Sequence, residues 1–290
     1  MTQRTVLAVT TIAACILAPP AMAAGGRIPI YGQTTITSPG TYQVTRDFTV
    51  SSGTAIVVQT GNVTIDLDGH TITSTDLSSP VIHANGFSPV RVSNGRIVGG
   101  HDGVRLEAFE GRFLAEDLYL SDQAGTAILV GGGGNSNHAV IVGNTIHRPA
   151  DYGIALSFLV GARIERNVVT LAGKDGVYVS AVGNVSLRAN NVANSNEAGL
   201  HLVFATHAAA VGDNVFAFNG GSGILVGDTI PSSVRNNAID GNLCESNQRY
   251  GLEFLPAATG NIYGRNRTPG NALGGVAPGA GNLDAGGNLP

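Results

Sequence analysis

The chain has 290 residues, of which 12% are charged, 41 are glycine and none is tryptophan, and its formal net charge is −4. Glycine far exceeds its usual share of about 7%, and the mildly acidic balance argues against nucleic-acid binding, which needs clustered Lys and Arg. Val, Ile and Thr alternate with polar residues, without the three- and four-residue apolar spacing of helices. The composition predicts an all-β protein of short strands and tight turns.

The first 23 residues have the order of a secretory signal peptide. Arg4 precedes an apolar stretch over residues 6–17, and small residues lead up to Ala23. We predict cleavage after Ala23, which leaves a secreted or periplasmic protein with a charge of −5, because Arg4 is the only charged residue removed. The alternative is a lipid anchor at Cys15, where residues 12–15 resemble a lipoprotein cleavage box. No other apolar run approaches the roughly 18 residues of a membrane span.

From residue 54 onward, an alternating apolar pair recurs, often directly after glycine. The first apolar residue of each pair returns every 22 to 28 residues, which is the period of a solenoid made of stacked turns. These marker residues are Ile56, Ile82, Val104, Ile128, Ile154, Val177, Leu200, Ile224 and Leu252.

A second column of polar residues follows the markers by about 13 positions, close to a half-turn of the repeat. Its members are Asn94, Asp117, Asn144, Asn167, Asn191, Asn214, Asn237 and Asn266. Asparagine tolerates the left-handed backbone of a sharp bend, and its amide can bond to the amide of the next turn. We therefore expect a ladder of stacked asparagines at one corner of the solenoid.

This repeat, with ITSPGTYQV at residues 36–44 and NVTIDLDGHTI at residues 62–72, resembles the parallel β-helix proteins of the pectate-lyase-like superfamily. The resemblance covers roughly residues 40–275 and implies an all-β, right-handed, single-stranded parallel β-helix of about nine turns with an N-terminal cap. We expect residues 24–53 to form the cap and first strands, residues 54–272 the β-helix, and residues 273–290 a loose tail rich in Gly, Pro and Asn. We also expect a monomer.

In superfamily members that process polysaccharides, the first sheet carries the substrate groove, so the resemblance implies a polysaccharide as the partner. Side chains alternate along a strand, so the residue after each marker points outward and stacks with its equivalents. Polar residues gather at and beside this column. The candidate catalytic residues are Asp151, Asp175, Tyr178, Glu197 and His201, and the candidate substrate-binding residues are Arg105, Lys174 and Glu253.

These residue types allow two reactions. Tyr178 and His201 fall on successive turns, so their rings should lie about 5 Å apart, where they could act as acid and base on one sugar. Asp175 lies one turn from Asp151 and one turn from Glu197, and either pair could supply the two carboxyl groups that a glycoside hydrolase requires. A polysaccharide lyase would instead hold Ca²⁺ with carboxylates. No other cofactor or metal site is predicted, because the histidines are scattered.

The sequence also departs from the enzyme patterns of the superfamily. It lacks the adjacent Asp-Asp pair of polygalacturonases, and Tyr152-Gly153 is not followed by the Asp-Pro-His of alginate epimerases. Stacked exposed rings and a salt ladder through Asp151, Lys174 and Glu197 would explain the same polar residues without chemistry. The alternative function is therefore a non-catalytic extracellular or periplasmic solenoid, serving as a structural or adhesive module.

Overall fold

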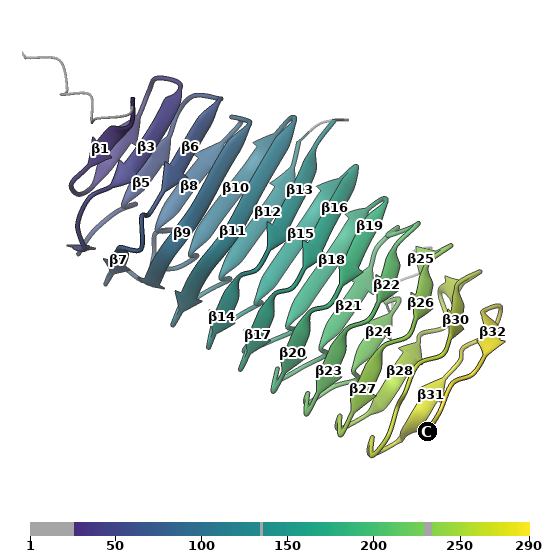
Figure 1. Cartoon of the computed structure of the whole chain (residues 1–290). Helices are drawn as coiled ribbons and strands as arrows, with labels where there is room; N and C mark the ends of the chain where they lie inside the picture. The colour runs from purple at the N-terminus through teal and green to yellow at the C-terminus, as the bar shows by residue number, and fades with distance from the viewer. Residues whose placement is uncertain (1–25, 134–135, 229–233) are drawn as a thin grey trace, which may run out of the picture.

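The computed structural model describes residues 26–133, 136–228 and 234–290, and within these ranges the chain forms strands but no α-helix. The strands stack into an elongated coil of about ten turns (Figure 1). Neighbouring turns pair in parallel, as β12, β15 and β18 do in succession (Ile128–Gly132, Ile154–Leu159 and Val177–Val182). The predicted all-β parallel solenoid is confirmed, whereas the predicted signal peptide and Cys15 lie outside the described residues.

One column of strands, here called the first sheet, contains 11 strands. In spatial order they are β2 (Thr34–Ile36), β5 (Ile56–Val58), β8 (Ile82–Asn85), β10 (Val104–Phe109), β12 (Ile128–Gly132), β15 (Ile154–Leu159), β18 (Val177–Val182), β21 (Leu200–Val203), β24 (Ile224–Val226), β28 (Tyr250–Phe254) and β31 (Gly274–Ala277). All nine marker residues lie in this sheet, and each is paired with the marker of the next turn, as Val177 is with Leu200. The structure adds β2 and β31 at the two ends.

The other two sides of the coil form one continuous sheet of 19 strands. They join because β9 and β11 each pair with two strands of a neighbouring turn. The strands are β1 (Ile28–Ile30), β3 (Gly40–Val44), β4 (Phe48–Val50), β6 (Val63–Asp66), β7 (Thr71–Ser74), β9 (Val90–Gly99), β11 (Arg112–Ser121), β13 (His138–Val142), β14 (Thr145–His147), β16 (Gly161–Glu165), β17 (Val168–Thr170), β19 (Val185–Arg188), β20 (Asn191–Ala193), β22 (Ala210–Gly212), β23 (Val215–Ala217), β26 (Ala238–Asp240), β27 (Leu243–Glu245), β30 (Ile262–Gly264) and β32 (Leu283–Gly286). Two short strands, β25 (Val234–Arg235) and β29 (Ala258–Thr259), pair separately.

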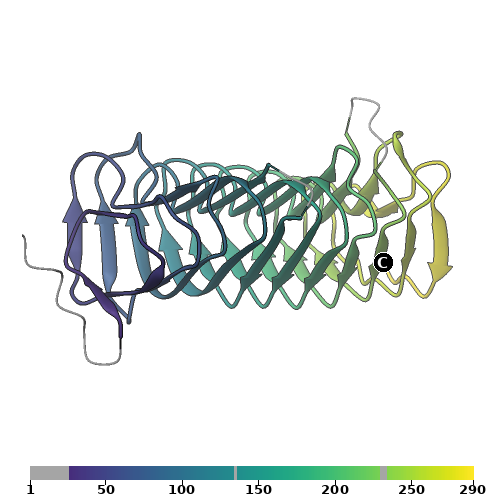
Figure 2. The ribbon, with the colours of Figure 1, turned by 90° about the horizontal axis from the view of Figure 1, so that it is seen from above.

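The hydrophobic core fills the inside of the coil, and the first and last turns lie at opposite ends of it (Figure 2). Strands alternate one buried and one outward residue, as Val177 and Val179 of β18 are fully buried on either side of Tyr178. This period of two is what places every second side chain of the first sheet on the outer surface.

Three ladders of asparagine, buried except at the last member of each, run along the coil. In the first, the amide of each residue donates to the side-chain oxygen of the next over 2.9–3.2 Å. Its members are Asn144, Asn167, Asn190, Asn214, Asn242, Asn266 and Asn288. The other two contain Asn219, Asn247 and Asn271, and Asn237, Asn261 and Asn282.

The predicted ladder is therefore confirmed in kind and wrong at several positions. Asn190 takes the place predicted for Asn191, whose side chain is exposed at the start of β20. Asn242 takes the place predicted for Asn237, which belongs to another ladder. Asn94 and Asp117 are exposed and have left-handed backbones, with φ of 60° and 52°.

The two ends of the chain continue the coil. Strands β1 and β3 pair with each other, and β3 pairs with β6, so the predicted cap region is built from strands of the stack. The sequence predicts a loose tail over residues 273–290, whereas β31 pairs with β28 and β32 pairs with β30. Strand β31 is only partly buried at all four residues, so backbone pairing without an apolar alternation forms this last turn.

Candidate functional site

The outward column of the first sheet has the register that the sequence predicts. Arg105 pairs with Leu129, Tyr178 pairs with His201, and Glu253 pairs with Leu225. Two hollows lie on this face, with volumes of about 270 and 340 Å³. The first hollow is lined by residues that include Arg105, Asp151, Tyr152, Ser157 and Tyr178. The second is lined by residues that include Asp175, Glu197, His201, Ser222, Arg249 and Glu253.

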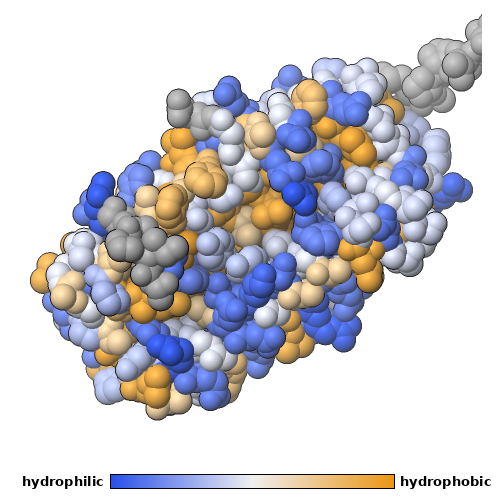
Figure 3. Space-filling view, turned by 180° about the vertical axis from the view of Figure 1, so that it is seen from behind, coloured by the Kyte–Doolittle hydropathy of each residue, from blue (hydrophilic) through white to orange (hydrophobic). Residues whose placement is uncertain are grey.

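The two hollows adjoin along the sheet, and together we call them the first-sheet groove. Tyr178 lines the first hollow and His201 the second, and their ring centroids are 5.7 Å apart in an edge-to-face arrangement. On this face, apolar surface in the middle of the molecule is bordered by polar side chains (Figure 3). The groove therefore has an apolar floor with charged groups beside it.

Tyr152 extends the ring stack on the other side of Tyr178. Their centroids are 4.8 Å apart, and the Lys174 ammonium lies 5.1 Å from the centre of the Tyr152 ring. Burial raises the pKa of Tyr152, although the nearby Lys174 charge opposes this. Tyr152 was not among the site residues predicted from the sequence, although its position directly before Gly153 at the strand entrance was an available signal.

Asp175 and His201 form a buried pair at the centre of the second hollow. The Asp175 side chain is 2% exposed, and its Oδ1 accepts a hydrogen bond of 2.8 Å from the Ala198 backbone N–H. Its Oδ2 lies 3.2 Å from His201 Nδ1, and His201 Nε2 lies 3.1 Å from the Gly227 carbonyl oxygen. Both ring nitrogens thus face acceptors, and only the doubly protonated imidazolium can donate to both.

The surroundings of His201 act on its pKa in opposite directions. Burial lowers the pKa, whereas the hydrogen bond and negative charge of Asp175, the Gly227 carbonyl and Asp228 raise it, and the net pKa is raised. This agrees with an imidazolium held between two acceptors. Because both Asp175 oxygens are engaged, this carboxylate is suited to orienting His201 rather than to attacking a sugar.

Glu253 is also buried and fully engaged. Arg249 donates to both of its oxygens, through Nε over 3.1 Å and Nη2 over 2.5 Å, and the Ser222 hydroxyl donates to Oε2 over 2.5 Å. Burial raises the Glu253 pKa, but Arg249, Ser222 and His201 lower it more, so the net pKa is lowered. The structure therefore places Glu253 beneath Arg249, whose side chain is 51% exposed.

In the first hollow, Arg105 is held by two carboxylates. Its guanidinium donates to Glu107 over 2.8 Å and to buried Asp102 over 3.4 Å. The hydrogen bond with Glu107 is the main cause of a raised Arg105 pKa, and the same bond lowers the Glu107 pKa. Neither Asp102 nor Glu107 was among the site residues predicted from the sequence.

The predicted charged column is only partly an ion-pair ladder. Lys174 Nζ lies 2.8 Å from Asp151 Oδ1, and this hydrogen bond raises the Lys174 pKa. Among the described residues, no ion pair joins Lys174 to Glu197, whose side chain is exposed. Glu197 is thus the one predicted catalytic carboxylate at the second hollow that has no ion-pair partner in the described part of the chain.

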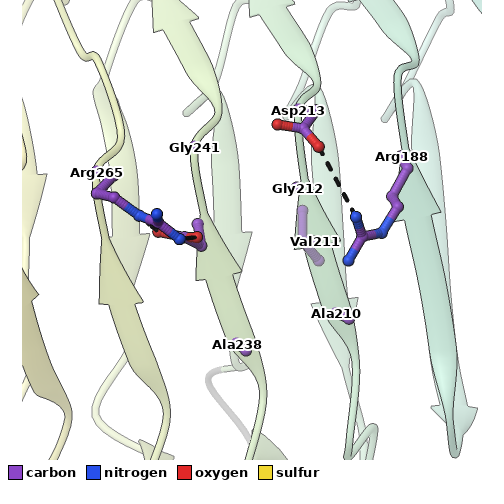
Figure 4. Close-up of a pocket in the computed structure, with 9 residues that line it drawn as sticks. Arg188, Ala210, Val211, Gly212, Asp213, Ala238, Gly241 and Arg265 are labelled. Carbon is purple, nitrogen blue, oxygen red and sulfur yellow. Dashed lines mark hydrogen bonds and ion pairs between the residues drawn. The ribbon is translucent and has the colours of Figure 1, made fainter.

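A larger hollow of about 460 Å³ lies on the 19-stranded sheet, and the sequence analysis did not select it. Arg188 and Asp213 border it on one side, with Nη1 and Oδ2 3.8 Å apart, and Arg265 pairs with Asp240 on the other (Figure 4). Ala210, Gly212 and Ala238 line its floor. Its depth comes from these small floor residues, and its charged groups are exposed and pair with each other.

The described ranges, residues 26–133, 136–228 and 234–290, also bear on metal binding and membrane insertion. No group of three or more His, Cys, Asp or Glu side chains there is arranged to hold a metal ion. In the same ranges, no helix is long and apolar enough to cross a membrane.

Comparison with known proteins assigns the family. A family profile described as "Right handed beta helix region" matches residues 126–286, so the chain belongs to the right-handed β-helix family. A search of curated proteins found no significant match.

Solved structures with the same fold include enzymes that act on polysaccharides. A periplasmic alginate epimerase double mutant is 15% identical with a TM-score of 0.57, over 91% of this chain and 77% of that one. The mannuronan C-5 epimerase A-module of Azotobacter vinelandii is 13% identical with a TM-score of 0.56, over 85% and 91%. The exopolygalacturonase of Thermotoga maritima is 9% identical with a TM-score of 0.55, over 89% and 84%. At these identities, the likeness concerns the fold alone.

Proposed function

We propose that this chain is an exported protein that binds a polysaccharide along the first-sheet groove. The observation that carries the proposal is the pair of adjoining hollows, joined where the Tyr178 ring meets His201. A chain-like ligand lying across the strands would meet both hollows in succession. The ring stack would supply apolar faces for sugar rings, and the charged groups would supply hydrogen bonds to hydroxyls.

The fold relatives support this proposal as an analogy, since several of them are enzymes that act on polysaccharides: an epimerase, a glucanase and an exopolygalacturonase. The predicted signal peptide would bring the chain to the periplasm or the medium, where such polymers occur. A structural or adhesive solenoid needs no hollow on its face, so the concave groove favours ligand binding over that alternative.

Cleavage is the second candidate, and the Asp175–His201 pair is the observation that favours it. A protonated His201 would be the general acid, Asp175 would orient it, and Glu197 would be the carboxylate available to act as a base or nucleophile. In a polysaccharide lyase, bound Ca²⁺ would assist, and the described residues contain no group of three or more His, Cys, Asp or Glu side chains arranged to hold it. Because Asp175 and Glu253 are both engaged, the arrangement supports binding more strongly than hydrolysis.

A polysaccharide-binding array with the chain from Ala24 onward tests the binding proposal. We expect retention on at least one polysaccharide, and weaker retention for Arg249→Ala and Tyr178→Ala. Arg188→Ala, at the hollow on the 19-stranded sheet, serves as the control and should bind normally. If the folded protein binds none of the plant, algal and bacterial polysaccharides, the proposal is wrong.

The same preparations can be assayed for new reducing ends and for unsaturated uronate, with and without Ca²⁺. Activity that is lost in both Glu197→Gln and His201→Gln would support cleavage. Binding without either product would assign the groove to recognition alone.

A further inference from the structure

Two phenylalanine side chains stand exposed at one border of the first-sheet groove. Phe158 is in β15, directly after Ser157, which lines the first hollow. Phe204 follows β21, whose His201 lines the second hollow. The two side chains are 59% and 49% exposed, yet their ring centroids lie 6.5 Å apart in an edge-to-face arrangement.

The position between them explains how the two rings meet. In the register of the sheet, Ser157 pairs with Ser180 and Ser180 pairs with Val203, so Ala181 occupies the equivalent position on the intervening turn. Its small side chain leaves a gap that the rings of the outer two turns can lean over. The result is an apolar ridge two turns long, opposite the charged strand entrances at Asp151, Lys174 and Glu197.

The backbone at this ridge is unfavourable for phenylalanine. Phe158 and Phe204 have φ of 54° and 39°, and Ala181 has 54°. A left-handed backbone disfavours residues other than glycine and asparagine, and exposed aromatic surface brings no compensating burial. Phe218 shares the conformation, with φ of 56° and 58% exposure, but it follows β23 on the 19-stranded sheet. Strain alone therefore assigns no role, and the pairing of the rings beside the groove is what distinguishes Phe158 and Phe204.

The charges of the groove restrict the ligand independently. Each Arg, Lys and His side chain at or beside the two hollows already faces a carboxylate: Arg105 faces Asp102 and Glu107, His101 faces Asp102, Lys174 faces Asp151, His201 faces Asp175, and Arg249 faces Glu253. With Glu197, six carboxylates stand beside two arginines, one lysine and two histidines, and Glu197 has no ion-pair partner in the described ranges. A polymer of uronic acids would bring further negative charge to a site that has no unpaired cation among its described residues, and like charges are repelled.

We infer that the groove accepts an uncharged polysaccharide, and that Phe158 and Phe204 stack on its sugar rings. This rests on the proposed function and deepens it by naming the class of polymer. The C–H faces of a sugar ring are apolar and match an exposed aromatic face, while its hydroxyls can bond to the ion-paired groups opposite without altering their charge.

Affinity measurements with soluble polymers test the inference. The probes are neutral β-glucan, α-glucan, mannan and xylan on one side, and alginate and polygalacturonate on the other, each with and without Ca²⁺. We expect binding to at least one neutral polymer, nearly constant between 0.05 and 0.5 M NaCl because no charge on the ligand is screened. Preferential binding to either uronate polymer would overturn the inference while supporting the proposed function. If the protein binds none of these polymers, the proposed function itself is contradicted.

Matched substitutions test the ridge. Phe158→Ala and Phe204→Ala should each weaken binding to the neutral polymer about tenfold, the usual scale for removing an aromatic anchor, and the double variant should weaken it further. Phe218→Ala has the same residue type, backbone and exposure on another face, and should bind like the parent. Ala181 already occupies the equivalent position, so alanine is compatible with this backbone. Thermal unfolding of the variants at the temperature of the parent would verify that they remain folded. Unaltered affinity in the double variant would overturn the inference. The inference would also be overturned if the substitutions changed only the mass measured by sedimentation and not the affinity, because the ridge would then be a contact between two copies of the chain.

Discussion

The early and late turns of the solenoid carry polar residues at the same corner and use them differently. At β9 and β11, Asn94 and Asp117 point into solvent with left-handed backbones. In the next turn this left-handed position is taken by Gly143, and Asn144 stands one residue later, opposite the buried Leu118 of β11. From Asn144 onward, the asparagine at this later position turns inward and is buried. The difference follows the strands: β9 and β11 run through the corner for ten residues each, whereas β13 and β14 are separate strands with Asn144 between them.

A broken strand leaves backbone groups at the corner without a ladder partner, and a buried unpaired group is costly. The Asn214 amide donates to the Leu187 and Gly212 carbonyls as well as to Asn242. The late turns therefore obtain hydrogen bonds at this corner from side chains, beginning with Asn144, whose side-chain oxygen accepts from the Leu118 backbone N–H of β11. The same residue type thus has a structural role in one half and a turn-forming role in the other.

The largest expected effect comes from breaking the first ladder in its middle. Asn214→Ala removes the partner of buried groups on both neighbouring turns, each costing about 1–3 kcal/mol when left unpaired. We expect the free energy of unfolding to fall by roughly 3 kcal/mol or more. Asn94→Ala removes an exposed bond to Asp66 and a favourable left-handed residue, so it should cost about 1 kcal/mol or less. Urea unfolding followed by circular dichroism measures both, and equal losses would contradict the proposed difference between the halves.

The sequence predicts the period, the first sheet and its outward column, because alternation and spacing are directly visible in it. It does not predict which asparagine is buried. Asn190 and Asn191 both fit a spacing of 23 or 24, and a one-residue shift turns a side chain from inside to outside. Asn242 was missed because 28 residues separate it from Asn214, in a turn lengthened between β24 and β26.

For the site, the same column placed Tyr178 next to His201, but the sequence could not predict which charges pair. Glu253 occupies an outward column position and is nevertheless 5% exposed, because Arg249 and Ser222 enclose it. Asp175 likewise lies under His201. These contacts depend on side-chain direction at the corners between strands, and the period does not specify it.

A buried thiol in the late turns allows a second comparison of the early and late turns. Cys244 is fully buried, and burial raises its pKa far above the usual range, so the thiol should react only when the turn opens. In a chain that starts at Ala24, Asn214→Ala should increase the labelling rate by about a hundredfold, if opening follows the loss of stability. Asn94→Ala should change it only a few fold. Similar acceleration by both variants would show that the coil opens as one unit.

A smaller, pH-dependent effect should arise at His201. Its folded pKa is raised, so its contribution to stability is present below the unfolded pKa of about 6.5 and is lost as the pH rises through the folded pKa. Thermal unfolding measured from pH 5.5 to 8.5 should therefore show a decline toward the alkaline end. His201→Gln cannot titrate and should flatten this decline. The lowered pKa of Glu253 acts below this window, since its usual value is 4.5. An equally steep decline in the variant would assign it to another group.

The smallest effect on stability is expected for an ion pair beside the first ladder, two residues before Asn190. Arg188 and Asp213 form an exposed pair with 3.8 Å between nitrogen and oxygen, and such pairs contribute little because water screens them. Arg188→Ala should change the free energy of unfolding by about 0.5 kcal/mol or less. The Arg188 carbonyl still accepts the Asn190 amide in this variant, because that bond involves only backbone on the arginine side. Asn190→Ala, in the same turn, should cost several times more. Both substitutions lie in the same turn and are measured by the same method, so the ratio of their losses in unfolding free energy compares a buried amide directly with a surface charge. A larger loss for Arg188→Ala than for Asn190→Ala would show that surface charges, and not the ladders, stabilise the late turns.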